Sequence, residues 1–177
     1  GEISALQAKD AGCTYALIGH AERRALGETD DDVRKKVAAA CVAELSPIIC
    51  IGEKVRDNHS GEYLETIKGQ LAAALHEVTP LLAKKIVIAY EPVWAIGVRE
   101  PMKAAQMHEM TILIRKVLWE KYEKAALKIP ILYGGAILDE SHATLMVKES
   151  EVNGFLLGRA SVDIERLKAL TNALSKV

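Results

Sequence analysis

A short apolar run followed by a helical segment occurs five times in this chain, and this repeat constrains the fold most. The runs end at a glycine or a polar residue and occupy residues 15–19, 46–53, 86–91, 129–135 and 152–158. Apolar residues at helical spacing predict helices over residues 5–11, 30–41, 61–78, 103–122, 142–148 and 164–174. Short strands that alternate with helices predict a parallel sheet covered by helices, an α/β fold. No linker or change in composition divides the chain into domains.

The third run carries the most informative ending. Residues 86–90 are apolar and include β-branched residues, which predicts a strand buried on both faces. Glu91 and Pro92 follow, and the strand should end there because proline cannot donate to a ladder. A carboxylate at the carboxyl end of a buried parallel strand lies where α/β folds place their active sites. Trp94 and Gly97 bracket a possible lid. The alternative is a solvated glutamate that begins a turn.

Other strand ends add candidate groups at the same rim. His20 follows the first run; alone it is compatible with a structural role, but beside Glu91 it becomes a candidate electrophile or proton shuttle. Gly134, Gly135 and Gly158 follow the last two runs, where backbone N–H groups near helix starts can surround a phosphate. Such glycines also occur in ordinary turns.

Three segments, residues 15–24, 89–97 and 132–135, resemble the signature segments of the triosephosphate isomerase family, in the same order. The resemblance implies a fold of the TIM (β/α)8-barrel family. It also implies the interconversion of dihydroxyacetone phosphate and glyceraldehyde 3-phosphate in glycolysis and gluconeogenesis, without a metal or an organic cofactor.

The resemblance assigns roles to individual residues. Glu91 matches the catalytic base, His20 the neutral electrophile, and Glu22 the acid that supports the site. The hinge of the lid matches Pro92, Val93 and Trp94. The backbone groups that bind the substrate phosphate match Gly97, Gly134, Gly135 and Gly158, and Arg159 is a candidate cation for that phosphate, or a solvated surface arginine.

The number of strands departs from the family. Five strands are too few for an eight-stranded barrel, so we expect residues 1–177 to form a single partial barrel with only strands 4–8 and their helices. The strand with the family's asparagine and phosphate-binding lysine has no counterpart, nor has the interface loop of these commonly homodimeric enzymes. Open barrel edges predict self-association or a complementary chain, with weak activity for this chain alone.

Smaller departures leave two alternatives. Residues 98–103 differ from the usual lid, Ala21 and Ala136 replace serines, and Gly158-Arg159 replaces a glycine pair. These differences resemble the erythrulose-phosphate isomerase branch of the superfamily. A further alternative is a catalytically weak partial barrel that binds a phosphorylated metabolite or a partner chain.

Composition excludes several partner classes. The net charge of −1 gives no broad electrostatic basis for binding nucleic acid or an anionic membrane, and no apolar run approaches the roughly 20 residues that span a bilayer. Three cysteines do not form a disulfide framework, which favours a reducing, cytoplasmic location. We therefore expect a phosphorylated small molecule as the ligand.

Overall fold

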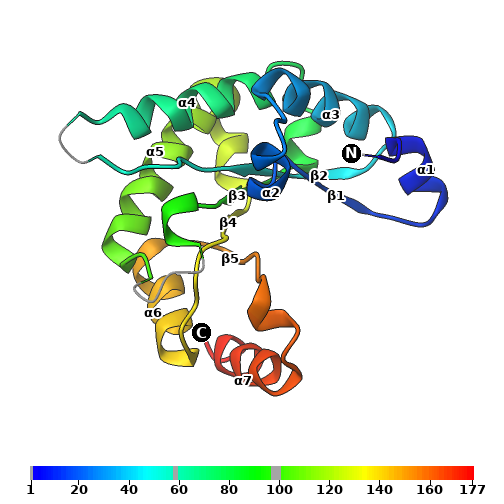
Figure 1. Cartoon of the computed structure of the whole chain (residues 1–177). Helices are drawn as coiled ribbons and strands as arrows, with labels where there is room; N and C mark the ends of the chain where they lie inside the picture. Colours follow the sequence, from blue (N-terminus) through cyan, green and yellow to red (C-terminus); the bar gives the residue numbers. More distant parts are fainter. Residues whose placement is uncertain (1, 58–59, 97–100) are drawn as a thin grey trace.

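The computed structural model describes residues 2–57, 60–96 and 101–177, and its centre is a parallel sheet of five strands in the order β1-β2-β3-β4-β5 (Figure 1). The strands are β1 (Tyr15–Ile18), β2 (Ser46–Ile51), β3 (Val87–Tyr90), β4 (Ile131–Tyr133) and β5 (Gly154–Phe155). Every neighbouring pair is parallel. All five strands therefore end at the same rim, and the predicted parallel α/β arrangement is confirmed.

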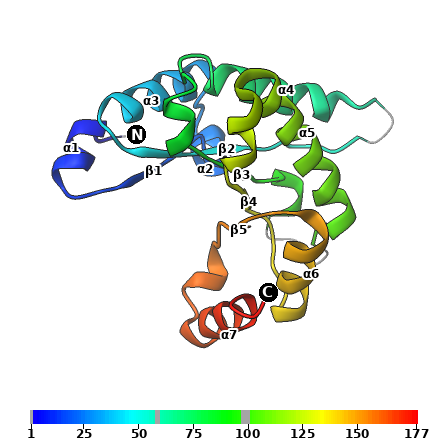
Figure 2. The ribbon, with the colours of Figure 1, turned by 180° about the vertical axis from the view of Figure 1, so that it is seen from behind.

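Helices connect successive strands on the outside of the sheet. The α-helices are α1 (Ala5–Asp10), α2 (Ala21–Ala25), α3 (Asp30–Val42), α4 (Glu62–Ala74), α5 (Ala104–Tyr122), α6 (Glu140–Ser150) and α7 (Ile164–Leu174). Short 3-10 turns are η1 (Leu82–Lys85), η2 (Val93–Ala95), η3 (Glu123–Lys128) and η4 (Arg159–Ser161). Both views show α3 to α7 following one another along an arc around the strands (Figures 1 and 2). The arc stays open between α1 and α7.

The core lies between the central strands and this arc. Ile49 of β2 is level with Ile88 of β3, and Ile88 is level with Ile131 of β4. All three side chains are fully buried. The apolar stripe of α5, which includes Met107, Met110 and Ile114, is buried as the helical spacing predicted.

Several local predictions need correction. No helix was predicted between residues 11 and 30, but the charged residues after β1 form the short helix α2, because His20 accepts the N–H of Glu22 and caps its start. The helix predicted over 142–148 is longer, because Asp139 caps α6 by accepting the N–H of His142. The helix predicted over 61–78 ends at Ala74. The strand predicted over 152–158 pairs only at Gly154–Phe155.

The first strand is less buried than its apolar sequence predicted. Tyr15 is 58% exposed and Leu17 is 47% exposed, although Ile18 is buried. Alternate side chains of a strand point to opposite faces, so one face of β1 is open. Ala16 and Ile18 point to the face that packs into the core, whereas Tyr15 and Leu17 point to the opposite face. β1 is also first in the sheet order, so among the described residues it pairs with β2 alone.

Candidate active site at the carboxyl ends of the strands

Glu91 follows the last residue of β3 and continues the ladder by one bond. Its backbone N–H donates to the carbonyl of Ile51 at 2.7 Å. Pro92 then turns the chain away with φ −62°. Glu91 is only 3% exposed, so the fold holds a carboxyl group away from water at the rim of the sheet.

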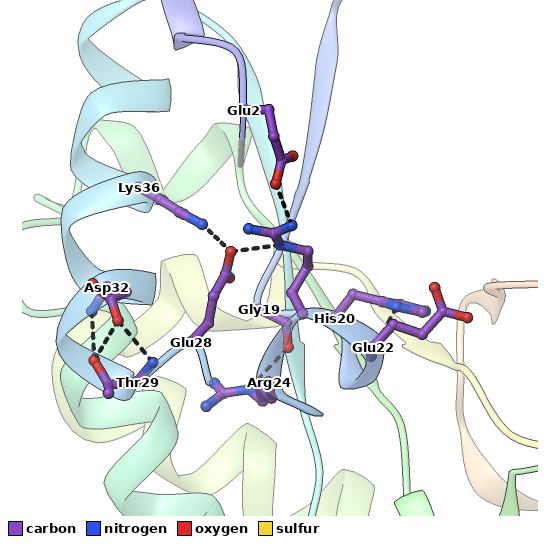
Figure 3. Close-up of polar contacts among 10 residues, drawn as sticks. Glu2, Gly19, His20, Glu22, Arg24, Glu28, Thr29, Asp32 and Lys36 are labelled. Carbon is purple, nitrogen blue, oxygen red and sulfur yellow. Dashed lines mark hydrogen bonds and ion pairs between the residues drawn. The ribbon is translucent and has the colours of Figure 1, made fainter. Parts of the chain in front are cut away.

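His20 lies beside this carboxyl group. Its Nε2 is 3.2 Å from Oε1 of Glu91. On the other side of the ring, Nδ1 accepts the N–H of Glu22 at 3.4 Å, at the start of α2, a contact drawn in Figure 3. A nitrogen that accepts an N–H cannot carry a proton itself, so the neutral ring holds its proton on Nε2. In this structure that hydrogen faces Oε1 of Glu91, and it can polarise a substrate oxygen that takes the place of this contact.

The surroundings make Glu91 a stronger base than an exposed glutamate. Burial raises the pKa of Glu91 above its ordinary value of 4.5, against the opposing effects of His20 and of the N–H of Ala21. That N–H donates to Oε2 of Glu91 at 3.3 Å. Desolvation penalises the charged form of a carboxyl group. Burial also raises the pKa of the neighbouring Cys50 thiol, and the charge of Glu91 adds to this effect.

Two glycines provide the space that Glu91 occupies. A Cβ on Gly52 would lie 1.8 Å from the carbonyl oxygen of Glu91, and a Cβ on Gly134 would lie 2.6 Å from its Cγ. Both distances are shorter than any real contact allows. Glycine at position 134, which the resemblance assigned to phosphate binding, is thus also required for the packing of Glu91.

The predicted hinge residues are anchored to the neighbouring strand end through Glu53. Trp94 donates from Nε1 to Oε1 of Glu53 at 2.8 Å, and the hydroxyl of Tyr90 donates to the same oxygen at 2.8 Å. The N–H of Val93 donates to the carbonyl of Glu53 at 3.0 Å. Glu53 is 2% exposed. Sequence reasoning noted an acid at the end of the second strand but gave it no role.

The other predicted site residues are less closely connected. Glu22 is exposed, and its backbone N–H contacts His20. Gly158 and Arg159 are exposed at the start of η4, and Arg159 makes no ion pair within the described ranges. Gly135 follows Gly134 after β4, where a Cβ would lie 2.1 Å from the hydroxyl oxygen of Tyr133. Gly97 lies outside the described residues.

Neither metal-binding side-chain clusters nor membrane-spanning helices occur in the described part of the chain. It contains no group of three or more His, Cys, Asp or Glu side chains placed to hold a metal ion. None of the helices in residues 2–57, 60–96 and 101–177 is long and apolar enough to cross a bilayer.

Comparison with known proteins matches the chain to one family. A family model described as triosephosphate isomerase matches residues 1–174. The triosephosphate isomerase of Moorella thermoacetica is 42% identical over 173 residues, covering 97% of this chain and 69% of that protein. The enzyme of Endomicrobium trichonymphae is 40% identical over 171 residues, covering 96% of this chain and 68% of the relative. The crystal structure of triosephosphate isomerase from Bartonella henselae superposes with a TM-score of 0.87 at 34% identity, covering 99% of this chain and 70% of that one. This chain belongs to the triosephosphate isomerase family.

Proposed function

We propose that this protein is an isomerase that interconverts dihydroxyacetone phosphate and glyceraldehyde 3-phosphate, the triosephosphate isomerase step of glycolysis and gluconeogenesis. The observation that carries the proposal is the contact of 3.2 Å between Oε1 of Glu91 and Nε2 of His20 at the carboxyl ends of two strands. It joins a buried carboxyl group to an imidazole that can donate a hydrogen bond, the two groups that an aldose-ketose isomerisation needs.

Glu91 is the proposed base. Its carboxylate removes a proton from the carbon next to the substrate carbonyl, and the electron pair of that C–H bond forms the C=C bond of an enediolate. The carbonyl electron pair moves onto its oxygen, which takes up a proton, while the hydroxyl group of the neighbouring carbon loses its proton and becomes the new carbonyl. Glu91 returns its proton to the former carbonyl carbon, so that no atom is gained or lost. Because burial raises the pKa of Glu91, the carboxylate accepts this proton more readily than an exposed one would.

His20 is the proposed electrophile. The Nε2–H donates to the substrate oxygen on which negative charge develops, and the bond from the N–H of Glu22 to Nδ1 holds the ring in position. The neutral imidazole gives this proton to one substrate oxygen and recovers a proton from the other. While Glu91 holds the proton from carbon, the loss at His20 and the gain at Glu91 cancel, so the net charge of the enzyme does not change. We propose that Glu22 supports the site through this backbone contact.

The phosphate site and lid complete the proposal. Gly97, Gly134, Gly135 and Gly158 are the proposed backbone contacts of the substrate phosphate, with Arg159 as a nearby cation. The packing of Gly134 against Cγ of Glu91 supports a phosphate site here, because the loop after β4 then lies next to the proposed base. Pro92, Val93 and Trp94 form the proposed hinge of a lid that excludes water from the enediolate.

A coupled assay with glyceraldehyde 3-phosphate tests the function. We expect turnover by the purified protein, and a loss of at least about 100-fold in kcat for Glu91→Gln, because the amide cannot accept the proton. Glu65→Gln on α4 is the matched control, since the same change is made at an exposed residue 76% accessible at its side chain. Equal rates for the protein and for Glu91→Gln would refute the assignment.

The second candidate substrate is a four-carbon sugar phosphate of the erythrulose type. Ala136 and Arg159 favour it, because they replace residues that the family usually carries at the lid and at the phosphate. The backbone N–H of Ala136 donates to the carbonyl of Ala95 at 3.4 Å, so the loop after β4 contacts the hinge turn η2 through the backbone. Parallel assays with the three- and four-carbon substrates distinguish the two by their kcat/KM ratio.

We also propose that residues 1–177 form one partial barrel whose five strands correspond to strands 4–8 of the family. The five-stranded open sheet and the share of about 70% of the Bartonella henselae chain support this correspondence. Self-association or a complementary chain then covers the open edges of the sheet. If nothing covers these edges, the alternative function is that of a catalytically weak partial barrel, which binds a phosphorylated metabolite or a partner chain. We place the protein in the cytoplasm, which cell fractionation tests.

A further inference from the structure

The loop that follows β4, residues 134–139, is held by an arginine to which no role has yet been assigned. The loop runs from the end of β4 to the start of α6 and includes Gly134 and Gly135. Ile137 is buried, with 6% exposed, whereas Leu138 is 50% exposed. The loop therefore packs against the core at one residue and faces solvent at the next.

Arg166 reaches this loop from the first turn of α7. Its Nη2 donates to the carbonyl of Leu138 at 2.9 Å and also to the carbonyl of Ile137. At the other end of the residue, the backbone N–H donates to Oδ1 of Asp163, the residue that caps the start of α7, at 3.1 Å. Arg166 therefore connects a capped helix to a loop 28 and 29 positions earlier in the chain.

The charge of Arg166 is directed at these two carbonyl groups. Among the residues that the structure describes, its guanidinium group forms no ion pair. The two acids nearest to it in the sequence have other partners, because Glu165 pairs with Lys168 at 2.9 Å and Asp163 caps α7. A hydrogen bond from a charged donor is stronger than one between neutral groups. Arg166 is itself exposed, so the fold should tolerate its replacement.

A second side chain, from α6, bonds the same residue of the loop. Nδ1 of His142 accepts the N–H of Leu138 at 3.3 Å, and the N–H of His142 donates to Oδ1 of Asp139 at 2.8 Å. The N–H of Leu138 is thus bonded to α6, and its carbonyl is bonded to α7. These two bonds fix the orientation of the backbone at Leu138, although half of this residue is exposed to solvent.

The helix that carries Arg166 also follows the other proposed phosphate loop. Gly158 and Arg159 come after β5, and η4 leads from them into α7. The N–H and the hydroxyl of Ser161 both donate to the carbonyl of Gly158, at 3.0 Å and 2.7 Å, which closes this turn. α6 and α7 lie side by side in both views (Figures 1 and 2). Arg166 therefore fixes the loop after β4 relative to the loop after β5.

We propose that Arg166 is a positioning residue for the substrate phosphate. It keeps the loops after β4 and β5 at a set separation, so that backbone N–H groups of both loops reach the same phosphate, and it does not itself touch the substrate. Donors bind an anion only within hydrogen-bond distance, so a loop that shifts by about 1 Å loses its contact. The inference rests on the proposed function, because that function is what brings a phosphate to these loops.

Arg166→Gln tests the inference by steady-state kinetics. The neutral amide lacks the charged donor, so we expect the KM for glyceraldehyde 3-phosphate to rise by about three- to tenfold. The kcat should change by less than about twofold, because Glu91 and His20 keep their contact. Arg166→Met, which keeps an unbranched side chain without any donor, should behave in the same way. Lys168→Gln removes the same charge from α7 at a side chain 61% exposed and should leave both constants unchanged.

The amide signal of Gly135 tests the inference without a substrate. In a proton–nitrogen correlation spectrum of the free protein, Arg166→Gln should shift this signal, and the Kd for inorganic phosphate at constant ionic strength should rise by the same factor as the KM. Lys168→Gln should do neither. If the unchanged protein does not turn over glyceraldehyde 3-phosphate, the proposed function fails, and the Gly135 signal with the phosphate titration still decides the role of Arg166. An unmoved Gly135 signal with unchanged phosphate affinity would overturn the proposal, as would a lower Tm without a change in KM, which indicates a structural role alone.

Discussion

At the scale of single residues, Glu91 is held in a position that favours its neutral form. Burial raises the pKa of Glu91 in the folded protein above 4.5, the ordinary value that the unfolded chain keeps. Between these two pKa values the folded protein binds more protons than the unfolded chain does. The free energy of unfolding therefore decreases as pH rises through this window, and the favourable contribution present below it is lost.

This argument predicts an effect of Glu91→Gln that depends on pH. Glutamine does not titrate, so the difference in Tm between Glu91→Gln and the unchanged protein should become more positive from about pH 4 to neutral pH. Thermal unfolding followed by circular dichroism at a series of pH values measures it. Glu65→Gln provides the control for an exposed glutamate. A difference that stays constant or becomes more negative with pH would contradict the raised pKa.

Gly134 leaves the space that the side chain of Glu91 occupies. Its Cβ in Gly134→Ala would lie 2.6 Å from Cγ of Glu91, so the carboxyl group has to move. Misplacement of a catalytic group by about 1 Å can cost about 100-fold in rate, and we expect kcat to fall by about 10- to 100-fold. In Gly69→Ala on α4 nothing lies within 4 Å of the new Cβ. That control should keep its kcat and gain about 0.5–1 kcal/mol in stability; equal kcat losses in both variants would exclude the steric explanation.

At the scale of elements, the segment from α2 to α3 is held by a charged cluster formed by Glu2, Arg23, Glu28 and Lys36 (Figure 3). Glu28 has a side chain 9% exposed and accepts from Nε of Arg23 at 2.7 Å and from Lys36. Burial acts to raise the pKa of Glu28, but the hydrogen bonds from Lys36 and Arg23 outweigh it and lower the pKa. The cluster thus connects the helix that follows His20 to the covering helix α3.

We predict that Glu28→Gln destabilises the protein by about 1–2 kcal/mol, because two cations lose their shared anion. The lowered pKa gives the pH dependence its sign: the stabilisation is present above the ordinary pKa of Glu28 and is lost as pH falls through the lower, folded value. Urea unfolding at neutral and acidic pH measures both effects. Glu2→Gln removes a partner whose side chain is 82% exposed and should lower the free energy of unfolding much less than Glu28→Gln does, because solvent screens the pair. Equal losses in the free energy of unfolding for Glu28→Gln and Glu2→Gln would contradict the role of Glu28 as the shared anion of the cluster.

Sequence patterns predicted the elements better than the contacts between them. The alternation of apolar runs and helical stripes was sufficient for the parallel sheet, and a residue such as Glu91 was found because it ends a buried strand. Glu53 received no role, because its bonds to Tyr90 and Trp94 join residues 37 and 41 positions apart. The exposure of Leu17 was also missed, since an apolar strand sequence does not show whether both faces of the strand are covered.

At the scale of the whole molecule, the open sheet is the dominant feature. Tyr15 and Leu17 lie two residues apart on β1, so they point to the same face, and both are about half exposed. Ile3 and Leu6, near α1, are also exposed large apolar residues, at 68% and 69%. A strand edge without a partner beside exposed apolar side chains is a template for pairing with another chain.

We therefore predict that the purified protein associates through β1. Light scattering after size exclusion should give a mass above the 19.3 kDa of one chain, and the mass should rise with concentration. The double change Tyr15→Lys with Leu17→Lys places charge on the open face of β1, which opposes burial against a second chain, and should return the mass toward 19.3 kDa. Val42→Lys introduces a lysine at an exposed apolar residue at the end of α3, 83% accessible, and should leave the association unchanged. A mass of 19.3 kDa at every concentration would mean that the edge needs no cover, whereas association that survives the double change but not Val42→Lys would place the interface on the helical side.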